Sequence, residues 1–224
     1  MLVSPAMSYK AVLFDLGGVV LGSPLHAIAD YERELGISPN FINRVVASTA
    51  PGGGWARLER GEITMEEFFD AFEHDCREAG EEISAREMML KMSQATKPRA
   101  SMLGAIKRLR AAKIRVAALT NNWATPDVAD GTGAIDTGTA QLRDYFDVFV
   151  ESSVEGLRKP DPKIYTLTCD RLGVAPDACV FLDDIGGNLK TARAMGIATI
   201  KVDTPEVALR ELETLVGLSL LEGA

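Results

Sequence analysis

The chain has 224 residues, of which 46% are hydrophobic and 25% charged, and its mean hydropathy is +0.04. This is the composition of a globular protein with one good core and room for a smaller second unit. The net charge is −8 and no basic stripe is visible, so we expect neither nucleic acid nor an anionic membrane surface as a partner. No apolar run approaches the roughly 18 residues of a membrane span, and the first residues lack the charged and apolar regions of a signal peptide.

The cysteines and histidines are few and scattered. Cys76, Cys169 and Cys179 stand far apart in apolar surroundings, which predicts reduced core residues in a cytoplasmic protein. His26 and His74 are also isolated. A zinc site or a Ser-His-Asp triad is therefore poorly supported.

The first predicted element is a short strand that ends in a carboxylate. Residues 11–14 form an unbroken apolar run, Asp15 ends it, and Gly17 and Gly18 follow almost at once. A run this short, bounded by turn residues, is typical of a strand buried on both faces of a parallel sheet. Asp15 then lies where such sheets bind ligands, and the glycines let the backbone come close to whatever it contacts. The alternative is that Asp15 merely caps a turn.

Residues 25–96 form a predicted helical region. Apolar residues recur there at helical spacing, and Thr64 with Glu67 makes a capping box at the start of one helix. We interpret the phenylalanine and methionine stripes as packing surfaces rather than as a cofactor site.

A glycine-rich stretch, residues 51–55, interrupts the helical pattern. It neither follows a strand nor has the spacing of a dinucleotide fingerprint, so it predicts a loop between helices. A functional interpretation is that Trp55 and Arg57 overhang a substrate pocket.

After residue 98 the pattern changes to a strict alternation of helix and strand. Strands separated by single helices form right-handed βαβ units and a parallel sheet. A Gly/Thr-rich stretch, residues 130–140, has no periodicity and predicts a surface loop without assigned chemistry. The expected helices cover residues 99–112, 142–145, 162–172, 188–195 and 205–215, and the expected strands residues 114–119, 147–150, 178–182 and 198–202.

Three of the apolar strands end in polar residues, namely Asp15, the pair Thr120 and Asn121, and the pair Asp183 and Asp184. Parallel strands place these ends at one edge of the sheet. Carboxylates gathered there repel one another unless a cation neutralises them, and oxygen-only ligands beside phosphate favour Mg²⁺. The hydroxyl of Thr120 and the amide of Asn121 suit an anionic oxygen.

Lys159, in the turn formed by residues 156–160, adds a mobile positive charge. A carboxylate nucleophile, Mg²⁺, a hydroxyl and a lysine are the groups that phosphoryl transfer requires. Taken alone, Lys159 would be expected to be a solvated loop residue. No glycine-rich phosphate loop ending in Gly-Lys-Ser/Thr is present, so a P-loop kinase or ATPase is not supported.

Four segments in this order resemble the motifs of the haloacid dehalogenase-like (HAD) superfamily: residues 15–19, 119–121, 159–160 and 182–184. The resemblance spans nearly the whole chain. It is stronger still to the phosphatase domain of soluble epoxide hydrolases and to the HAD domain fused to certain acyl-CoA dehydrogenases. It implies an α/β fold with a Rossmann-like parallel sheet in a core of residues 1–22 and 98–224. Residues 23–97 would be an inserted α-helical cap.

The resemblance also implies the metal ligands and the nucleophile. Asp15 would attack phosphorus to give an aspartyl-phosphate. Asp15, the main-chain carbonyl of Gly17 and Asp184 would hold Mg²⁺, and Asp183 would act through water or as a weaker ligand.

The phosphate contacts follow from the same resemblance. Thr120 and the backbone at Asn121 would hold the phosphoryl oxygens of a small phosphorylated substrate, and Lys159 would pair with both Asp15 and the phosphate.

Gly17 departs from the family pattern, in which a second aspartate serves as general acid and base. Such a group is typically worth about 10²–10⁴ in rate. We therefore expect aryl or acyl phosphates to be hydrolysed faster than sugar phosphates, unless a cap residue such as Glu59 donates the proton. Two alternatives to a phosphatase stay open: a haloacid dehalogenase, and a non-catalytic module that binds a phosphorylated or acyl ligand.

Overall fold

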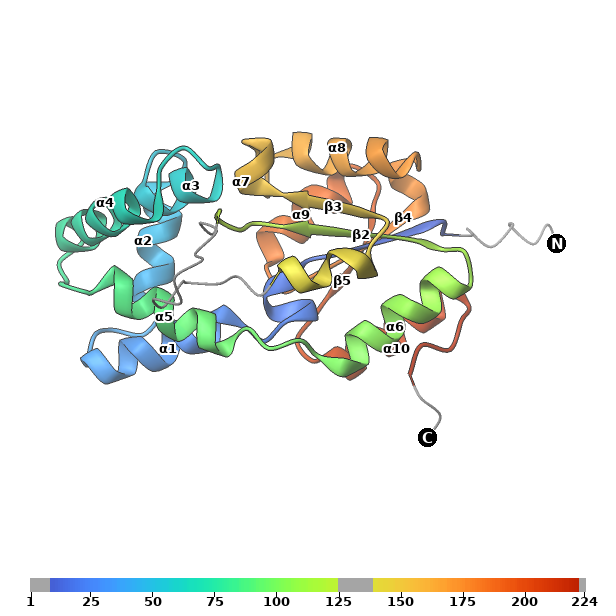
Figure 1. Cartoon of the computed structure of the whole chain (residues 1–224), viewed down its shortest axis with the longest axis horizontal. Helices are drawn as coiled ribbons and strands as arrows, with labels where there is room; N and C mark the ends of the chain where they lie inside the picture. Colours follow the sequence, from blue (N-terminus) through green and yellow to red (C-terminus); the bar gives the residue numbers. More distant parts are fainter. Residues whose placement is uncertain (1–8, 125–138, 222–224) are drawn as a thin grey trace.

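The centre of the molecule is a five-stranded parallel sheet with the order β3-β2-β1-β4-β5 (Figure 1). The computed structural model describes residues 9–124 and 139–221. The parallel α/β architecture expected from the sequence is confirmed. The strands are β1 (Ala11–Phe14), β2 (Arg115–Thr120), β3 (Val148–Glu151), β4 (Cys179–Asp183) and β5 (Ala198–Lys201).

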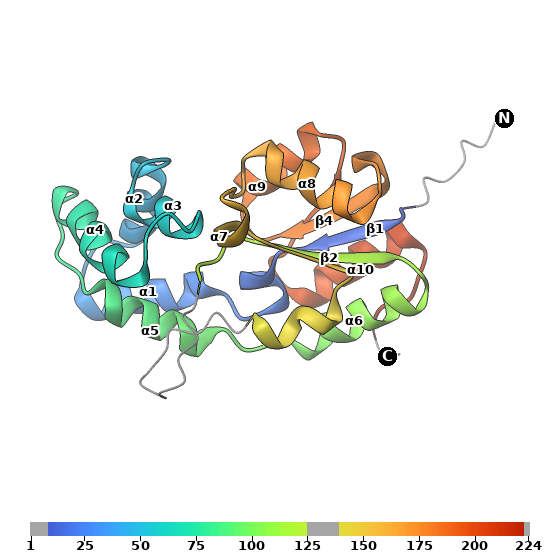
Figure 2. The same cartoon turned by 45° about the horizontal axis from the view of Figure 1, so that its top comes forward.

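The two faces of the sheet are covered by different pairs of helices, which lie on opposite sides of the sheet in Figures 1 and 2. Alternate residues of β1 point to opposite faces, as strand geometry requires. Val12 and Phe14 belong to the cluster with α6 (Ala100–Ala111) and α10 (Pro205–Val216). The other face packs against α8 (Pro162–Leu172) and α9 (Gly186–Ala194). All four β1 residues are fully buried, which explains the unbroken apolar run.

The strand register brings three chain segments together at the carboxyl edge of the sheet. Phe14 lies beside Ala118 of β2 and Leu182 of β4, and the Asp15 N–H donates to the Leu182 carbonyl at 2.9 Å. β2 and β4 run one residue further than predicted, through Thr120 and Asp183, because a polar side chain does not interrupt the backbone ladder. Thr120 and Asp183 are therefore the last residues of β2 and β4 rather than the first residues after them.

Five helices pack together beyond that edge around a third hydrophobic cluster (Figure 1). The predicted helical region is thus divided by turns. Leu21 and Pro98 form an antiparallel bridge where the chain leaves the sheet and returns to it. The helices are α1 (Pro24–Leu35), α2 (Phe41–Thr49), α3 (Gly54–Glu59), α4 (Met65–Glu78) and α5 (Ala85–Ala95).

Two local features of these helices bear on the predictions. The capping box of α4 is confirmed, since the Thr64 side chain accepts from the Glu67 N–H and the Glu67 side chain accepts from the Thr64 N–H. The expected loop over residues 51–55 is wrong at its end, because Gly54 and Trp55 already belong to α3. The Gly54 N–H donates to the Asp75 carboxylate of α4 at 2.8 Å, and this bond fixes the start of α3.

The remaining segments are short turns. A kinked turn (Leu16–Val20), in which Gly17 and Gly18 have non-helical angles, follows β1, and 3₁₀ turns cover Ala140–Tyr145 and Pro176–Ala178. Helix α7 (Ser152–Glu155) was not predicted. Most of the predicted surface loop, residues 130–138, lies outside the described residues.

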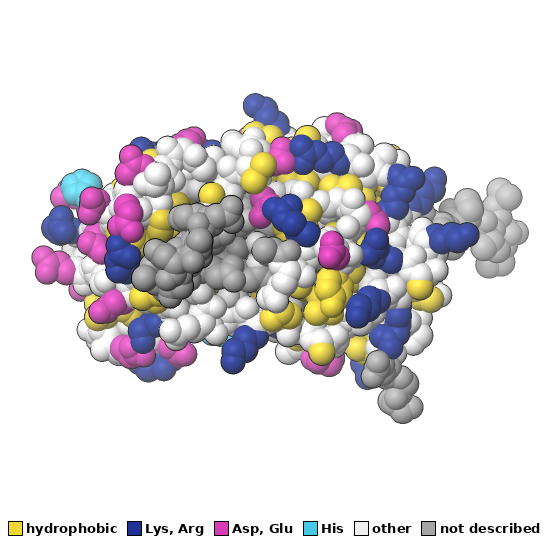
Figure 3. Space-filling model, in the orientation of Figure 1, with side chains coloured by type: hydrophobic (Ala, Val, Ile, Leu, Met, Phe, Trp, Pro, Cys, Tyr) yellow, Lys and Arg dark blue, Asp and Glu magenta, His cyan; other side chains and the backbone are white. Residues whose placement is uncertain are grey.

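On the face seen in Figure 3, acidic and basic side chains are scattered among hydrophobic and uncharged ones. Within residues 9–124 and 139–221, every helix is too short or too polar to cross a bilayer.

Candidate active site

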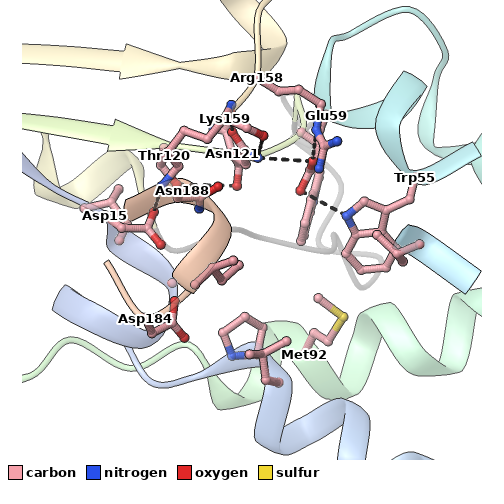
Figure 4. Close-up of a pocket in the computed structure, with 18 of the residues that line it drawn as sticks. Asp15, Trp55, Glu59, Met92, Thr120, Asn121, Arg158, Lys159, Asp184 and Asn188 are labelled. Carbon is pink, nitrogen blue, oxygen red and sulfur yellow. Dashed lines mark hydrogen bonds and ion pairs between the residues drawn. The ribbon is translucent and has the colours of Figure 1, made fainter. Parts of the chain in front are cut away.

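Lys159 lies at the centre of the polar residues at the carboxyl edge of the sheet (Figure 4). Its side chain is 1% exposed, and its Nζ lies 2.8 Å from Asp15 Oδ1 and 2.8 Å from Asp183 Oδ2. The contact with Asp15 is the one that the resemblance implies, whereas Lys159 is neither mobile nor the solvated loop residue expected of it when it is taken alone. An ammonium group is buried here because two carboxylates accept its hydrogen bonds and balance its charge.

Asn121 fixes the backbone that carries Lys159. The Lys159 N–H donates to Asn121 Oδ1 at 2.8 Å, and Asn121 Nδ2 donates to the Lys159 carbonyl at 3.0 Å. The side-chain amide of Asn121 is thus occupied and is not directed at an anionic ligand. Thr120, which is 3% exposed, lines the cavity beside it.

Asp183 is completely buried and surrounded by donors. Its Oδ1 accepts from the Ile185 N–H at 2.7 Å, and its Oδ2 accepts from Lys159. Asn188 Nδ2 lies 3.1 Å from one oxygen and 3.0 Å from the other, and its own carbonyl accepts from the Tyr165 hydroxyl. Asp183 therefore orients Lys159, and Asn188 is a contributor that the sequence reasoning missed.

Carboxylate oxygens of Asp15, Asp183 and Asp184 lie within 4.8 Å of one another. Lys159 balances only one of the three possible negative charges. An oxygen-only donor set with this excess of negative charge fits a hard divalent cation such as Mg²⁺.

Burial and the neighbouring carboxylates also disfavour ionisation of Asp15 and of Asp184. Burial raises the pKa of Asp15 to about 8, helped by Asp183 and Asp184, although Lys159 opposes the shift. Burial, followed by the charge of Asp183, raises the pKa of Asp184 to about 6. The pKa of Lys159 is raised because Asp15 and Asp183 outweigh its own desolvation. A bound cation would favour the ionised carboxylates.

The two glycines after Asp15 differ in what they tolerate. Gly18 has φ +80°, and a Cβ built there would lie 2.1 Å from Asp184 Oδ2, so a side chain would displace that carboxylate. Gly17 has an ordinary backbone conformation (φ −66°, ψ 122°), and its Cβ would meet only Pro24 carbons at 3.5 Å. The Gly18 carbonyl accepts from Arg99 Nη1 at 2.8 Å, a contact that the sequence reasoning also missed.

A cavity of about 570 Å³ extends from Asp15 into the α1–α5 helices. Gly17, Thr120, Lys159 and Asp184 line its polar end. Trp55 lines the cavity as expected, whereas Arg57 is not among the described lining residues. The walls beyond the polar end are mostly apolar, formed by Leu16, Leu21, Pro24, Leu25, Ile28, Val46, Ala47, Trp55, Met92 and Trp123.

Comparison with known proteins agrees with this geometry. The family model for haloacid dehalogenase-like hydrolases matches residues 9–196, and the chain belongs to that family. It is 39% identical to acyl-CoA dehydrogenase family member 10 of Mus musculus over 97% of its length, and 36% identical to bifunctional epoxide hydrolase 2 of Sus scrofa over 96%. It spans only 20% and 40% of those two proteins.

Two further comparisons cover both proteins almost completely. The chain is 26% identical to a sesquiterpene phosphatase of Aspergillus oryzae, over 94% of the chain and 98% of that protein. A HAD family enzyme of Bacteroides thetaiotaomicron, solved with magnesium and inorganic phosphate, superposes with a TM-score of 0.58 at 24% identity. That superposition covers 87% of this chain and 94% of the other, and it shows a shared fold.

Proposed function

We propose that the protein is a Mg²⁺-dependent phosphatase that acts on a small phosphorylated substrate through an aspartyl-phosphate on Asp15. The observation that carries the proposal is the arrangement of Asp15. It lies 2.8 Å from a buried lysine, within a carboxylate cluster suited to a cation, at the polar end of a cavity. The similarity of the chain to a phosphatase over 94% of its length supports the same conclusion.

In the proposed mechanism, an Asp15 carboxylate oxygen forms a bond to phosphorus while the bond from phosphorus to the leaving oxygen breaks. Lys159 neutralises charge on Asp15 and on the phosphoryl oxygens, and Thr120 with the Asn121 backbone holds those oxygens. Water then hydrolyses the aspartyl-phosphate and releases inorganic phosphate.

Asp15, the Gly17 carbonyl and Asp184 would hold Mg²⁺. The cation would supply charge neutralisation for the incoming phosphate. We assign Asp183 mainly to orienting Lys159, since both of its oxygens already accept hydrogen bonds. A carboxylate cluster of this kind has no evident use in a dehalogenase, which favours phosphoryl transfer.

Three hydrophobic clusters, one on each face of the sheet and one among α1–α5, support a division into a core of residues 1–22 and 98–224 and a cap of residues 23–97. The cavity lies between these parts, with the reacting groups on the core side. The cysteines are buried free thiols, which supports the expected cytoplasmic location.

Gly17 and the cavity walls together indicate the chemical class of the leaving group. Without a second aspartate, an alkoxide leaves slowly, whereas a carboxylate or phenolate needs little help from a proton. The apolar cavity walls suit a hydrocarbon or aromatic body on that leaving group. We therefore propose acyl or aryl phosphates with a mostly apolar body as the best substrates.

The test is phosphate release from a panel of aryl, acyl and alkyl phosphates with Mg²⁺ or with EDTA, with Asp15→Asn run in parallel. The proposal expects turnover that requires Mg²⁺ and disappears in Asp15→Asn. A folded protein that releases no phosphate from any substrate would instead favour the non-catalytic binding module.

A further inference from the structure

Glu59, the last residue of α3, is a carboxylate at the cavity wall that the proposed reaction does not use. It is 7% exposed and accepts hydrogen bonds from both parts of the molecule. Trp55 Nε1 donates to Oε1 at 3.0 Å from within α3. Arg158 Nε donates to Oε2 at 2.6 Å, and Asn121 Nδ2 approaches the same oxygen at 3.4 Å, both from the sheet side (Figure 4).

These contacts do not leave Glu59 free to act as a general acid. Both of its carboxylate oxygens already accept hydrogen bonds, and a proton on Oε2 would displace the Arg158 or Asn121 donor. The geometry therefore does not support Glu59 as the cap residue that would donate the missing proton. Its partners indicate a different role.

The partners of Glu59 adjoin the lysine of the active site. Arg158 immediately precedes Lys159, and Asn121 clamps the Lys159 backbone through two hydrogen bonds of 2.8 and 3.0 Å. The ion pair between Glu59 and Arg158 is largely shielded from water, with side-chain exposures of 9% and 19%. A shift of α3 is thereby transmitted to the segment that sets the position of the Lys159 ammonium group.

A second contact holds the turn after α3 against the core. Gly61 adopts φ +66°, and a Cβ there would lie 2.3 Å from the carbonyl oxygen of Ser153 in α7. This close backbone approach places the turn after Glu59 directly against the core. The ion pair and the backbone contact therefore hold the same turn of the α1–α5 helices against the sheet edge.

We infer that Glu59, through Arg158 and Asn121, is a positioning residue that couples seating of the α1–α5 helices on the core to correct placement of Lys159. The inference rests on the proposed phosphatase function. Loss of the Glu59 charge would leave Asp15 and the metal ligands in place but allow the Lys159 segment to shift. Displacements of about 1 Å in such groups cost up to about a hundredfold in rate.

The test is a double-mutant cycle with Glu59→Gln, Arg158→Gln and the combined variant, assayed with phenyl phosphate and Mg²⁺. Each single variant is expected to lower kcat about tenfold to a hundredfold and to change KM less than about threefold. The combined variant should be no slower than the slower single variant, because either substitution already breaks the ion pair that joins Glu59 to Arg158. Glu62→Gln, which breaks the exposed pair with Arg60, is the matched control and should leave kcat unchanged.

A second readout follows from the protein's two tryptophans, Trp55 and Trp123, which both line the cavity. Their fluorescence measures binding of inorganic phosphate with Mg²⁺ without turnover, and both single variants should weaken that binding non-additively. The inference would be overturned if the losses of kcat in the two single variants simply multiplied in the combined variant, or if Glu59→Gln left kcat unchanged. Loss of one limb of the pH–rate profile in Glu59→Gln would also overturn it, because it would indicate a proton-transferring group. A wild-type protein that neither hydrolyses phenyl phosphate nor binds phosphate would overturn the proposed function itself, and this inference with it.

Discussion

Gly17→Asp is predicted to create the general acid that this chain lacks. Gly17 has backbone angles that aspartate adopts without strain, and its Cβ would meet Pro24 at 3.5 Å, an ordinary van der Waals contact. The new carboxyl group would belong to a residue at the polar end of the cavity, which Asp15 and Asp184 also line. These neighbouring negative charges raise its pKa and help it to hold a proton.

The expected gain depends on the leaving group. General acid catalysis contributes about 10²–10⁴ in rate, or about 3–5 kcal/mol of barrier, to departure of an alkoxide. We therefore expect kcat/KM for an alkyl phosphate to rise by about that factor, and kcat/KM for acetyl phosphate to change less than about tenfold. The assay is phosphate release from both compounds by wild type and Gly17→Asp at saturating Mg²⁺.

Two further variants serve as controls. Gly17→Asn has the same shape but no carboxyl proton, and it should give no selective gain on the alkyl phosphate. Gly18→Ala should reduce activity on both compounds and weaken Mg²⁺ binding, because its methyl group would displace Asp184. If folded Gly17→Asp leaves the alkyl-to-acyl rate ratio unchanged, or if Gly17→Asn matches it, the assigned role of Gly17 is wrong.

The remaining predictions concern the charge cluster and the cavity. Lys159→Met leaves Asp15 and Asp183 without the ammonium group that pairs with them, and it should lower the free energy of unfolding by about 3–5 kcal/mol, measured by urea denaturation. A variant as stable as the wild type would contradict the buried ion pairs of Lys159. In the metal-free protein, pKa values of about 8 for Asp15 and about 6 for Asp184 lie above the unfolded value of 3.8, so the folded state binds more protons. The free energy of unfolding of the metal-free protein should then fall as pH rises from about 4 to about 8. Added Mg²⁺ should raise Tm more at the upper end of this range, where the carboxylates are ionised. A rise in Tm with Mg²⁺ that does not depend on pH would argue against this cluster as the metal site. Met92→Trp should raise KM for large aryl phosphates but spare acetyl phosphate, since Met92 lines the apolar end of the cavity; equal effects on both would place the leaving group elsewhere.

The sheet and its polar edge were predictable because they rest on local patterns. Short apolar runs ending in Asp15, Thr120 and Asp183 define buried strands, and parallel pairing alone brings their ends together. The bounds of α8 agree with the prediction because Asp161 and Pro162 mark its start by capping chemistry.

The contacts that organise the site were not predictable in the same way. Glu59 and Arg158 are 99 positions apart, and no local pattern pairs them. Lys159 resembles a solvated turn residue until Asp15 and Asp183 are placed around it. Asn188 looks like the start of a helix, and its contact with Asp183 depends on how α9 meets β4.

The covalent intermediate on Asp15 is the most direct test of the proposed function. The protein would be mixed with radiolabelled acetyl phosphate and Mg²⁺, quenched in acid within the first turnover, and digested for peptide mapping. The account predicts label on the peptide that contains Asp15, with no label in Asp15→Asn or with EDTA. Turnover that proceeds without label on Asp15, or that survives in Asp15→Asn, would contradict it.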